Sequence, residues 1–389
     1  MASGVGTTED VRRSNLSAIL GILYRSGPAS RAALSKRTGR NRSTIASLVT
    51  DLVGLGLVEE SDPDSLGHVG RPSPVVTIRP EVTAIAVNPE IDALTIGLVG
   101  LDGRVHRVIR HEYDRIPAAS EVLSITAAAI SGMRVELQGL LVAGIGVAVP
   151  GQVRTGDGVV RNAPHLSWRD EPLAEPLAAA TGYVVQVAND AALGALAEHE
   201  FGVGRGKDHL IYLNGGASGI GGGVISGGIL LGGTSGYAGE FGHVRVSSSS
   251  VIDSAGIEGT LEAEVTRAEL LEVLGLARPE SGQFEEALLA DRSDRVAAVV
   301  ERQLGHLGTA IAAAINLLNP QVVALGGFLA ALATYDPDRL ERAVAASSLA
   351  PSLEGVRITA AELGADLLMV GAAGLTFRKL LADPASISR

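Results

Sequence analysis

The sequence contains no cysteine and few aromatic residues, and both shortages exclude classes of function. Without cysteine, the chain forms no disulfide and holds neither a cysteine-ligated zinc ion nor an iron–sulfur cluster. Aromatic residues make up 3% of the chain, which argues against binding of single-stranded nucleic acid by base stacking. A cysteine-free chain fits a reducing compartment, and we expect a cytoplasmic protein.

Long apolar runs are also missing. Glycine, asparagine or a charged residue interrupts each apolar stretch before it reaches the length of a membrane-spanning helix. The first ten residues, MASGVGTTED, are polar and end in two acids, so they lack the basic start and apolar segment of a signal peptide. A chain of 389 residues is too long for one compact core and predicts two or three domains.

Positive charge is scarce overall but concentrated near the start of the chain. The formal net charge is −11, yet residues 1–80 hold 10 Lys and Arg against 7 Asp and Glu, whereas the rest holds 22 against 36. Residues 11–58 hold 8 basic residues and one acid, Asp51. A basic segment on an acidic body is typical of a duplex-binding module attached to a second domain. A solvated basic face would give the same pattern.

Three short helical segments near the start predict a helix-turn-helix. Apolar residues recur at helical spacing within residues 14–25, and a Gly-Pro pair ends that segment. Ser30 can cap a second, short helix, for which Gly39 suits the left-handed C-terminal position. Asn41 can cap a third helix with one apolar face. A short helix, a tight turn and a second amphipathic helix form the helix-turn-helix arrangement.

The third helix is expected to enter the major groove of DNA with its first turn. Residues 57–60 and 75–78 predict the two strands of a wing, whose connecting loop could reach the minor groove. Arg and Asn suit bidentate base contacts, and hydroxyls suit phosphate oxygens. The segment resembles the winged-helix domains of bacterial repressors, although a three-helix module for protein contacts alone is the alternative. The predicted DNA contacts are Arg40, Asn41, Arg42, Ser43, Thr44, Ser47 and Arg71.

From residue 81 onward, strand-like segments alternate with alanine-rich helices, which is typical of α/β architecture. Residues 213–223 form a glycine-rich turn whose amides could surround an anion or sugar phosphate, although such turns are also common structural features. The predicted strands are 84–87, 94–99, 145–149, 184–187, 210–213 and 322–325. The predicted helices are 121–138, 190–200, 260–274 and 295–317.

Five polar residues near these turns predict a site for a polyol. Carboxylates, an amide and an imidazole can each pair with adjacent hydroxyls in a cleft. Asn189 and Asp190 follow a predicted strand, so capping of the next helix is the alternative for them. We expect Trp168 to be a packing residue, and the acidic stretch 258–272 to be a solvated helix face apart from Glu262. The five residues of this predicted polyol site are Asn189, Asp190, Glu240, His243 and Glu262.

Seven segments together resemble the ROK family of bacterial sugar-responsive repressors and sugar kinases. The resemblance implies a two-lobed, actin-like or hexokinase-type α/β domain over residues 81–389, behind a winged helix at 1–80. It places the family's sugar contacts on the five residues above, with Asp190 at the catalytic-base position of the kinases, and it implies a homodimer or homotetramer. His165 stands where the family often has Asn. The segments are GIGVAVPGQV, NAPHLSW, VANDAALGALAE, 213–233, GYAGEFGHVRV, SAGIEGTLE and NPQVVALGG.

The chain departs from the family pattern at two places. Where the kinases carry a phosphate loop of the type Asp-x-Gly-Gly-Thr, it reads Asn88-Pro89-Glu90-Ile91-Asp92. The glycines are gone and proline removes one N–H donor, so we expect weak or absent ATP binding and no phosphoryl transfer. Where the family places three zinc-binding cysteines, the chain reads Asp253, Ala255 and Thr260, while Gly256 and Gly259 remain. Of the four usual zinc ligands only His243 is left, so we expect no zinc.

These patterns predict a transcriptional regulator, most simply a repressor, whose affinity for operator DNA changes with a bound sugar. A sugar kinase that carries a DNA-binding head is the alternative from another class, and the altered phosphate loop argues against it. In a third hypothesis the large domain serves only oligomerisation or a protein partner. The expected partners are double-stranded operator DNA, a sugar effector and a second copy of the chain.

Overall fold

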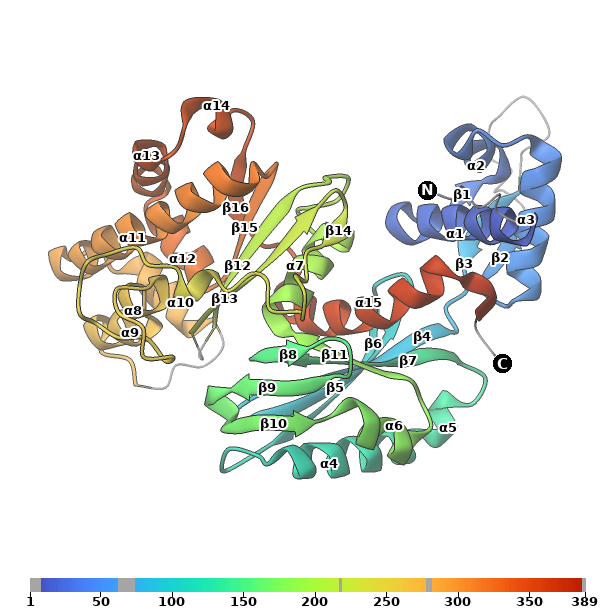
Figure 1. The fold of residues 1–389 in the computed structure, drawn as a ribbon, viewed down its shortest axis with the longest axis horizontal. Helices are drawn as coiled ribbons and strands as arrows, with labels where there is room; N and C mark the ends of the chain where they lie inside the picture. Colours follow the sequence, from blue (N-terminus) through green and yellow to red (C-terminus); the bar gives the residue numbers. More distant parts are fainter. Residues whose placement is uncertain (1–7, 62–73, 217–218, 278–281, 387–389) are drawn as a thin grey trace. The chain divides into compact units, whose positions relative to one another are not determined.

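The computed structural model describes residues 8–61, 74–216, 219–277 and 282–386 (Figure 1). Its described residues fall into two compact units. Unit 1 lies within residues 1–148, 172–187 and 372–389, and unit 2 within 149–171 and 188–371. No helix in the described part of the chain is long and apolar enough to cross a membrane.

Unit 1 begins with a winged helix-turn-helix, which we call the head (residues 8–61 and 74–78). The predicted caps are present: Ser30 Oγ accepts from Ala33 N, Gly39 is left-handed, and Asn41 Oδ1 accepts from Thr44 N. A short strand pairs with the wing and was not predicted. The elements are α1 (Thr8–Ser26), β1 (Ala29–Ser30), α2 (Arg31–Thr38), α3 (Arg42–Gly54), β2 (Val58–Ser61) and β3 (Val75–Ile78), and the strand order is β1-β3-β2.

The rest of unit 1 is built on a five-stranded sheet of order β11-β7-β4-β5-β6. Strands β4, β5 and β6 follow one another along the chain and form an antiparallel meander. Strand β4 also pairs in parallel with β7. The central strand β4 is buried along its whole length, as expected of a strand covered on both faces. The elements are β4 (Val82–Pro89), β5 (Ala93–Gly100), β6 (Val105–Glu112), α4 (Ala119–Gly132), α5 (Arg134–Leu137), β7 (Leu141–Val149), α6 (Ala174–Thr181), β11 (Val185–Asn189), α15 (Leu367–Ala382) and η4 (Pro384–Ser386).

Unit 2 contains a second five-stranded sheet, of order β14-β13-β12-β15-β16, and a three-stranded sheet, of order β10-β9-β8. The strands are β8 (Gln152–Arg154), β9 (Val159–Ala163), β10 (Trp168–Pro172), β12 (Leu210–Gly216), β13 (Gly219–Ser226), β14 (Ile229–Leu230), β15 (Val322–Gly327) and β16 (Arg357–Ala360). The helices are η1 (Pro164–Leu166), α7 (Asp190–Phe201), η2 (Phe241–His243), α8 (Leu261–Glu264), α9 (Arg267–Leu274), α10 (Gln283–Ala290), α11 (Asp294–Leu318), α12 (Phe328–Tyr335), α13 (Pro337–Ser347), α14 (Ala350–Leu353) and η3 (Gly364–Asp366).

The two five-stranded sheets share one topology. In each, three antiparallel strands follow one another along the chain, and the first of them pairs in parallel with a later strand. In unit 2 the 25-residue helix α11 supplies much of the core that covers the sheet. Its N-cap is Ser293, and Asn319 ends it in the left-handed conformation. The repeated topology confirms the predicted two-lobed α/β fold.

The six strands predicted from residue 81 onward are confirmed, and they correspond to β4, β5, β7, β11, β12 and β15. Two predicted helices differ from the structure. Segment 121–138 divides into α4 and α5, and segment 260–274 divides into α8 and α9. The second break has a local cause, because Thr266 Oγ1 accepts from Glu269 N and so starts a new helix.

The glycines of strand β13 permit close packing rather than forming an open anion loop. A Cβ atom on Gly223 would lie 2.6 Å from Ala195 Cβ and 2.9 Å from Ala192 Cα of helix α7. Helix α7 therefore lies almost directly on the backbone of the strand. The anion-binding interpretation of this turn is not needed to explain its glycines.

Candidate functional site

Unit 2 contains a cavity of about 360 Å³ whose lining includes all five residues predicted to contact a sugar. Cavities of this size hold small ligands. Apolar groups also line it, among them Pro150, Ile220 and Ile257. The cavity therefore combines hydrogen-bonding groups with apolar surface, as a sugar ring requires. The five predicted residues are Asn189, Asp190, Glu240, His243 and Glu262.

Asn189 and Asp190 lie where strand β11 ends and helix α7 begins. Asn189 Oδ1 accepts from Ala192 N at 2.9 Å, and its Nδ2 donates to Gly151 O at 3.1 Å. Asp190 Oδ1 accepts from Ala191 N at 2.7 Å. The capping alternative is thus correct for Asn189, but capping and lining the cavity coexist, because the helix N-terminus itself opens into the cavity.

Two glutamates enter the cavity from different segments. Glu240 precedes η2, and its Oε1 accepts from Gln152 Nε2 at 3.2 Å. Glu262 lies on α8, and its Oε2 accepts from Ile220 N at 3.2 Å. Gly219 has a φ of +122°, and a Cβ atom there would lie 2.2 Å from Glu262 Oε2. A glycine at this position leaves the space that the glutamate occupies.

His243 contacts a buried carboxylate that the sequence did not predict as part of the site. Its Nδ1 lies 2.8 Å from Asp253 Oδ2, and the side chain of Asp253 has no exposed surface. Burial lowers the pKa of His243, but the hydrogen bond to Asp253 and the nearby carboxylates outweigh burial, so the pKa lies above its ordinary value. Burial alone would raise the pKa of Asp253, but its hydrogen bonds lower it to about 2.

The cavity is also lined by polar residues that were not predicted from the sequence. His165, noted as a departure from the family, is among the lining residues, whereas Trp168 is 3% exposed and belongs to the core, which confirms its packing role. Four polar lining residues were not predicted. They lie in or beside the segments that resemble the ROK family, so the family resemblance was the signal that could have identified them. They are Gln152, Asn162, Asn214 and Ser254.

The segment that replaces the kinase phosphate loop is a tight β-hairpin in unit 1. Asn88 and Pro89 still belong to strand β4, opposite Thr95 and Leu94 of β5, and Glu90 N donates to Ala93 O at 2.7 Å. Asn88 Nδ2 donates to Ala148 O at 3.1 Å. The Glu90 amide, which lies in the segment that matches the kinase phosphate loop, is therefore engaged within the hairpin.

Two carboxylates, those of Glu90 and Asp92, stand at the tip of this hairpin. Burial raises the pKa of Glu90, while the charge of Arg110 at 3.4 Å opposes that shift. Acidic groups repel an anionic triphosphate, and no glycine or lysine compensates within the hairpin. This hairpin differs from the glycine-rich loops that bind phosphate groups through backbone amides.

The head presents cations around the turn between α2 and α3. Lys36, Arg37, Arg40 and Arg42 are exposed, and none has a carboxylate within 4.0 Å among the described residues. Three other arginines of the head are paired with carboxylates. Arg12 pairs with Asp51, Arg13 with Asp10, and Arg31 with Glu60. Four exposed cations without a carboxylate partner in the described part of the chain thus lie near the turn at which a helix-turn-helix meets phosphates.

The predicted DNA contacts on α3 occupy one end of that helix. Asn41, Ser43 and Ser47 are exposed and Thr44 is half-buried. Asn41 Oδ1 is engaged by Thr44 N and Ser43 Oγ, both at 2.8 Å, so its amide nitrogen remains the group for a base contact. Arg71 lies outside the described residues.

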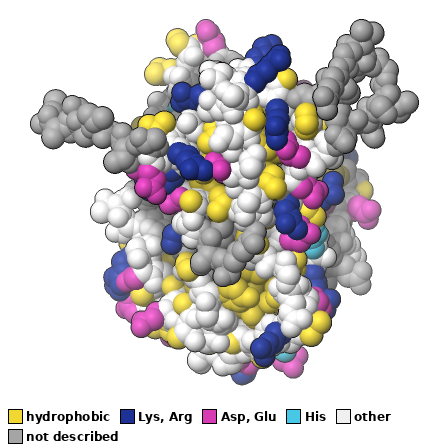
Figure 2. Space-filling view, turned by 90° about the vertical axis from the view of Figure 1, so that its right-hand side faces the viewer, with side chains coloured by type: hydrophobic (Ala, Val, Ile, Leu, Met, Phe, Trp, Pro, Cys, Tyr) yellow, Lys and Arg dark blue, Asp and Glu magenta, His cyan; other side chains and the backbone are white. Residues whose placement is uncertain are grey.

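The face of the molecule that Figure 2 shows is mixed in charge. On the face shown in Figure 2, Lys and Arg side chains lie singly among uncharged and acidic ones rather than in one continuous patch. Such a surface fits contacts by a few positioned side chains better than a broad electrostatic footprint.

The sequence profile of the ROK family matches residues 91–379. The chain belongs to the ROK family. A putative xylose repressor of Caldicellulosiruptor sp. (strain Rt8B.4) is 26% identical over 96% of this chain and 98% of its own length. A glucokinase of Streptomyces coelicolor is 30% identical over 72% of this chain and 93% of its own length. Similarity thus extends to repressors and to kinases.

A solved structure matches almost the whole chain. It is a ROK family transcriptional regulator, a homologue of the E. coli MLC protein, with a TM-score of 0.76 and 24% identity. The match covers 95% of this chain and 99% of that one. It confirms the fold of a head followed by a ROK domain, whereas the glucokinase match leaves about a quarter of this chain uncovered.

Proposed function

We propose that this ROK protein is a transcriptional regulator, most simply a repressor, whose affinity for operator DNA changes when a sugar binds in unit 2. One observation supports the proposal above others. The same chain carries a helix-turn-helix with unpaired cations around the first turn of α3 and a separate cavity lined by carboxylates, amides and imidazoles. The putative xylose repressor aligns over 98% of its own length and 96% of this chain, a span too long to leave out the head.

The composition of the cavity favours a neutral sugar over an anionic ligand. Asp190, Glu240 and Glu262 give it three carboxylates, which accept hydrogen bonds from hydroxyl groups and repel phosphate or carboxylate groups. No lysine or arginine belongs to the lining that the described residues form. An unphosphorylated monosaccharide or a derivative of one is therefore the proposed effector.

The DNA-binding part of the proposal is tested by removing two of the unpaired cations. The double substitution Arg40→Ala and Arg42→Ala removes charges near phosphates, so affinity for operator DNA falls. The slope of log affinity against log salt becomes shallower by about 1 for each phosphate that is no longer neutralised. The matched control is Arg205→Ala, an exposed arginine of unit 2. Unchanged affinity and slope in the double variant would refute DNA binding by this surface.

A second candidate function is sugar phosphorylation, favoured by Asp190 at the kinase base position and by the glucokinase relatives. We propose that phosphoryl transfer is absent, since positioning and charge neutralisation dominate this chemistry and the hairpin at Asn88–Asp92 offers neither. A coupled assay of ATP turnover with D-glucose or D-xylose tests this. Sugar-dependent turnover that disappears in Asp190→Asn would establish the kinase instead.

We further propose that the chain acts as a homodimer or homotetramer. Paired heads bind two half-sites related by symmetry, so a palindromic operator mirrors the symmetry of the protein. A molar mass measured by light scattering at twice or four times 39.8 kDa would support pairing. A monomer on DNA at saturating operator would contradict it.

A further inference from the structure

The loop between η2 and α8 occupies the position of the family's zinc-binding segment, and it is built around one carboxylate. Asp253 Oδ1 accepts from Ala255 N and Ile257 N, each at 2.9 Å. Asp253 Oδ2 accepts from Thr260 Oγ1 at 2.9 Å and lies 2.8 Å from His243 Nδ1. Each carboxylate oxygen thus has two partners, which uses its full acceptor capacity.

These residues do not fit a zinc ion. A structural zinc site needs four ligands, usually thiolates and imidazoles, whereas this position offers one imidazole, one carboxylate and one hydroxyl. The carboxylate oxygens are already engaged by N–H and O–H donors. No group of three or more potential His, Cys, Asp or Glu ligands occurs within the described ranges. The loop therefore depends on hydrogen bonds where the family pattern depends on metal.

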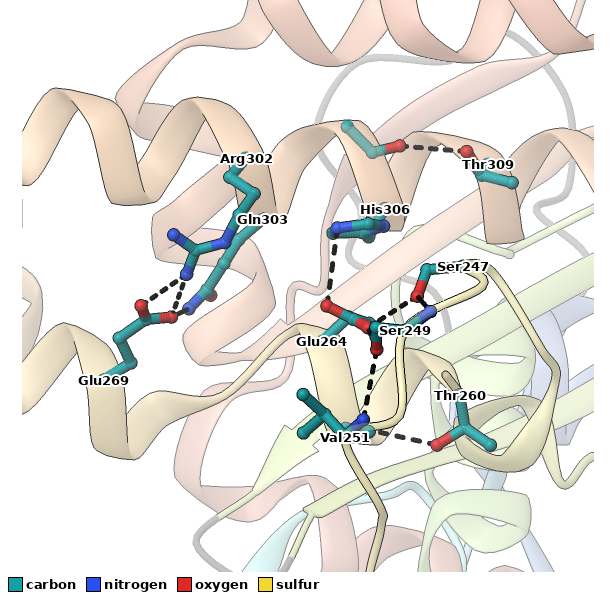
Figure 3. A network of polar contacts seen from close by, with 12 residues as sticks. Ser247, Ser249, Val251, Thr260, Glu264, Glu269, Arg302, Gln303, His306 and Thr309 are labelled. Carbon is teal, nitrogen blue, oxygen red and sulfur yellow. Dashed lines mark hydrogen bonds and ion pairs between the residues drawn. The ribbon is translucent and has the colours of Figure 1, made fainter. Parts of the chain in front are cut away.

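A second carboxylate holds the outer part of the same loop. Glu264 Oε1 accepts from Ser247 Oγ at 2.6 Å and also from Ser249 Oγ, and Glu264 Oε2 lies 3.6 Å from His306 Nε2 on α11 (Figure 3). Glu264 thus attaches the outer part of the loop to the body of unit 2 through residues that do not line the cavity, whereas Ser254 N and Oγ donate to Glu262 Oε1 at the cavity itself. Asp253 holds the inner part of the loop through the amides of Ala255 and Ile257, and it also contacts His243.

The contact between Asp253 and His243 determines which ring nitrogen is available to a ligand. Asp253 already accepts three other hydrogen bonds and, when ionised, has no proton to donate, so His243 Nδ1 must carry the hydrogen of this contact. Nε2 is then the remaining polar atom of a ring that lines the cavity. A carboxylate behind an imidazole fixes both its tautomer and its orientation.

We propose that Asp253 is a positioning residue of the sugar site, which takes the place of the family's zinc and presents His243 Nε2 to a ligand hydroxyl. The proposal rests on the proposed sugar-binding function of the cavity. Asp253 itself is buried and is absent from the cavity lining, so its effect on a ligand passes through His243. An Asn at this position would turn an NH₂ group toward donors and lose at least one hydrogen bond.

The test is a double-mutant cycle on sugar affinity. With whichever of D-xylose and D-glucose binds the full chain, Asp253→Asn raises the dissociation constant by about tenfold or more. In a His243→Gln background the same substitution changes the dissociation constant by less than about twofold, because Asp253 can no longer act through the imidazole of His243. Ser247→Ala is the matched control, a loop hydroxyl bonded to Glu264, and it leaves affinity unchanged. Equal losses in both backgrounds would show a merely structural role and overturn the proposal.

Two measurements on the unmodified chain test the geometry without a measurement of sugar affinity. Long-range ¹H–¹⁵N spectra, with the His243 signal assigned by its loss in His243→Gln, should show hydrogen on Nδ1 and, in the neutral ring, none on Nε2. Metal analysis of protein purified without added metal should give far less than one zinc per chain. The opposite tautomer or one zinc per chain would overturn the proposal. If neither sugar binds, the proposed function loses its effector class while these spectra still test the placement of His243.

Discussion

At the scale of single residues, the cavity carboxylates carry the claim of sugar binding. Glu240 is held by Gln152 Nε2, so its carboxylate is oriented before a ligand arrives. Glu240→Gln replaces charge-assisted hydrogen bonds with neutral ones, and we expect the dissociation constant for the sugar to rise about tenfold. Isothermal titration calorimetry measures this, with the exposed Glu354→Gln as control. Equal affinities for the two variants would remove Glu240 from the site.

Glu264 gives a residue-scale prediction that depends on pH. Burial would raise its pKa, but hydrogen bonds from Ser247 and Ser249 and the charge of His306 outweigh burial, so the pKa is lowered. A depressed pKa in the folded state stabilises the protein above the unfolded-state pKa, and this contribution is lost as pH falls through the folded-state pKa. This revises the expectation that residues 258–272 are a solvated face, because the side chain of Glu264 is 11% exposed.

We expect Glu264→Gln to lower the free energy of unfolding by about 1–2 kcal/mol at pH 7. The difference from the unmodified chain should shrink as the pH falls below the ordinary glutamate pKa of about 4.3 and vanish as it falls through the lowered pKa of Glu264. Urea unfolding at several pH values measures it. A difference that stays constant from pH 7 to pH 3 would contradict the ionised, hydrogen-bonded state of this carboxylate.

At the scale of elements, the packing of α7 on β13 positions Asp190, which is the first residue of α7 and lines the cavity. Gly223→Ala places a Cβ atom against Ala195 and Ala192, so we expect a loss of about 1–3 kcal/mol in unfolding free energy and weaker sugar binding. Gly132→Ala at the end of α4 meets no atom within 4 Å and should not destabilise the chain. Thermal unfolding of both variants separates a steric effect from a general effect of replacing glycine.

Local signals in the sequence predicted most elements, and non-local contacts account for what was missed. The caps Ser30 and Asn41 bond to atoms three residues away, so their residue types predicted the helix starts. Strand β1 could not be predicted, because its two residues pair with Val76 and Val75. The division between α8 and α9 had a readable signal, since Thr266 and Glu269 match the spacing of a capping box.

The same contrast between local signals and non-local contacts applies to the residues of the candidate site. The five polar residues were predicted because motifs near strand ends contain them, and the structure brings them to one cavity. Asp253 was treated only as a lost cysteine, because its partners His243 and Thr260 lie ten residues before and seven after it. No local pattern marks a carboxylate as the centre of such a network.

At the scale of the whole molecule, the account requires coupling between the sugar cavity and the head. Coupling of binding free energies is reciprocal. If a sugar changes the dissociation constant for operator DNA by a given factor, saturating operator must change the dissociation constant for that sugar by the same factor. Calorimetric titration of the sugar with and without operator measures it. A shift of one affinity without the other would mean that the sugar acts on something other than this protein–DNA equilibrium.

The central claim, a DNA-binding regulator controlled by a sugar, is tested most directly by fluorescence anisotropy. The full chain is titrated against labelled DNA from upstream of its own gene and against an unrelated fragment of equal length. Two salt concentrations and a monosaccharide panel that includes D-xylose and D-glucose complete the design. The account predicts salt-sensitive binding that prefers the upstream fragment and that one sugar shifts severalfold. Equal affinity for both fragments, or selective binding that no sugar of the panel shifts, would contradict it.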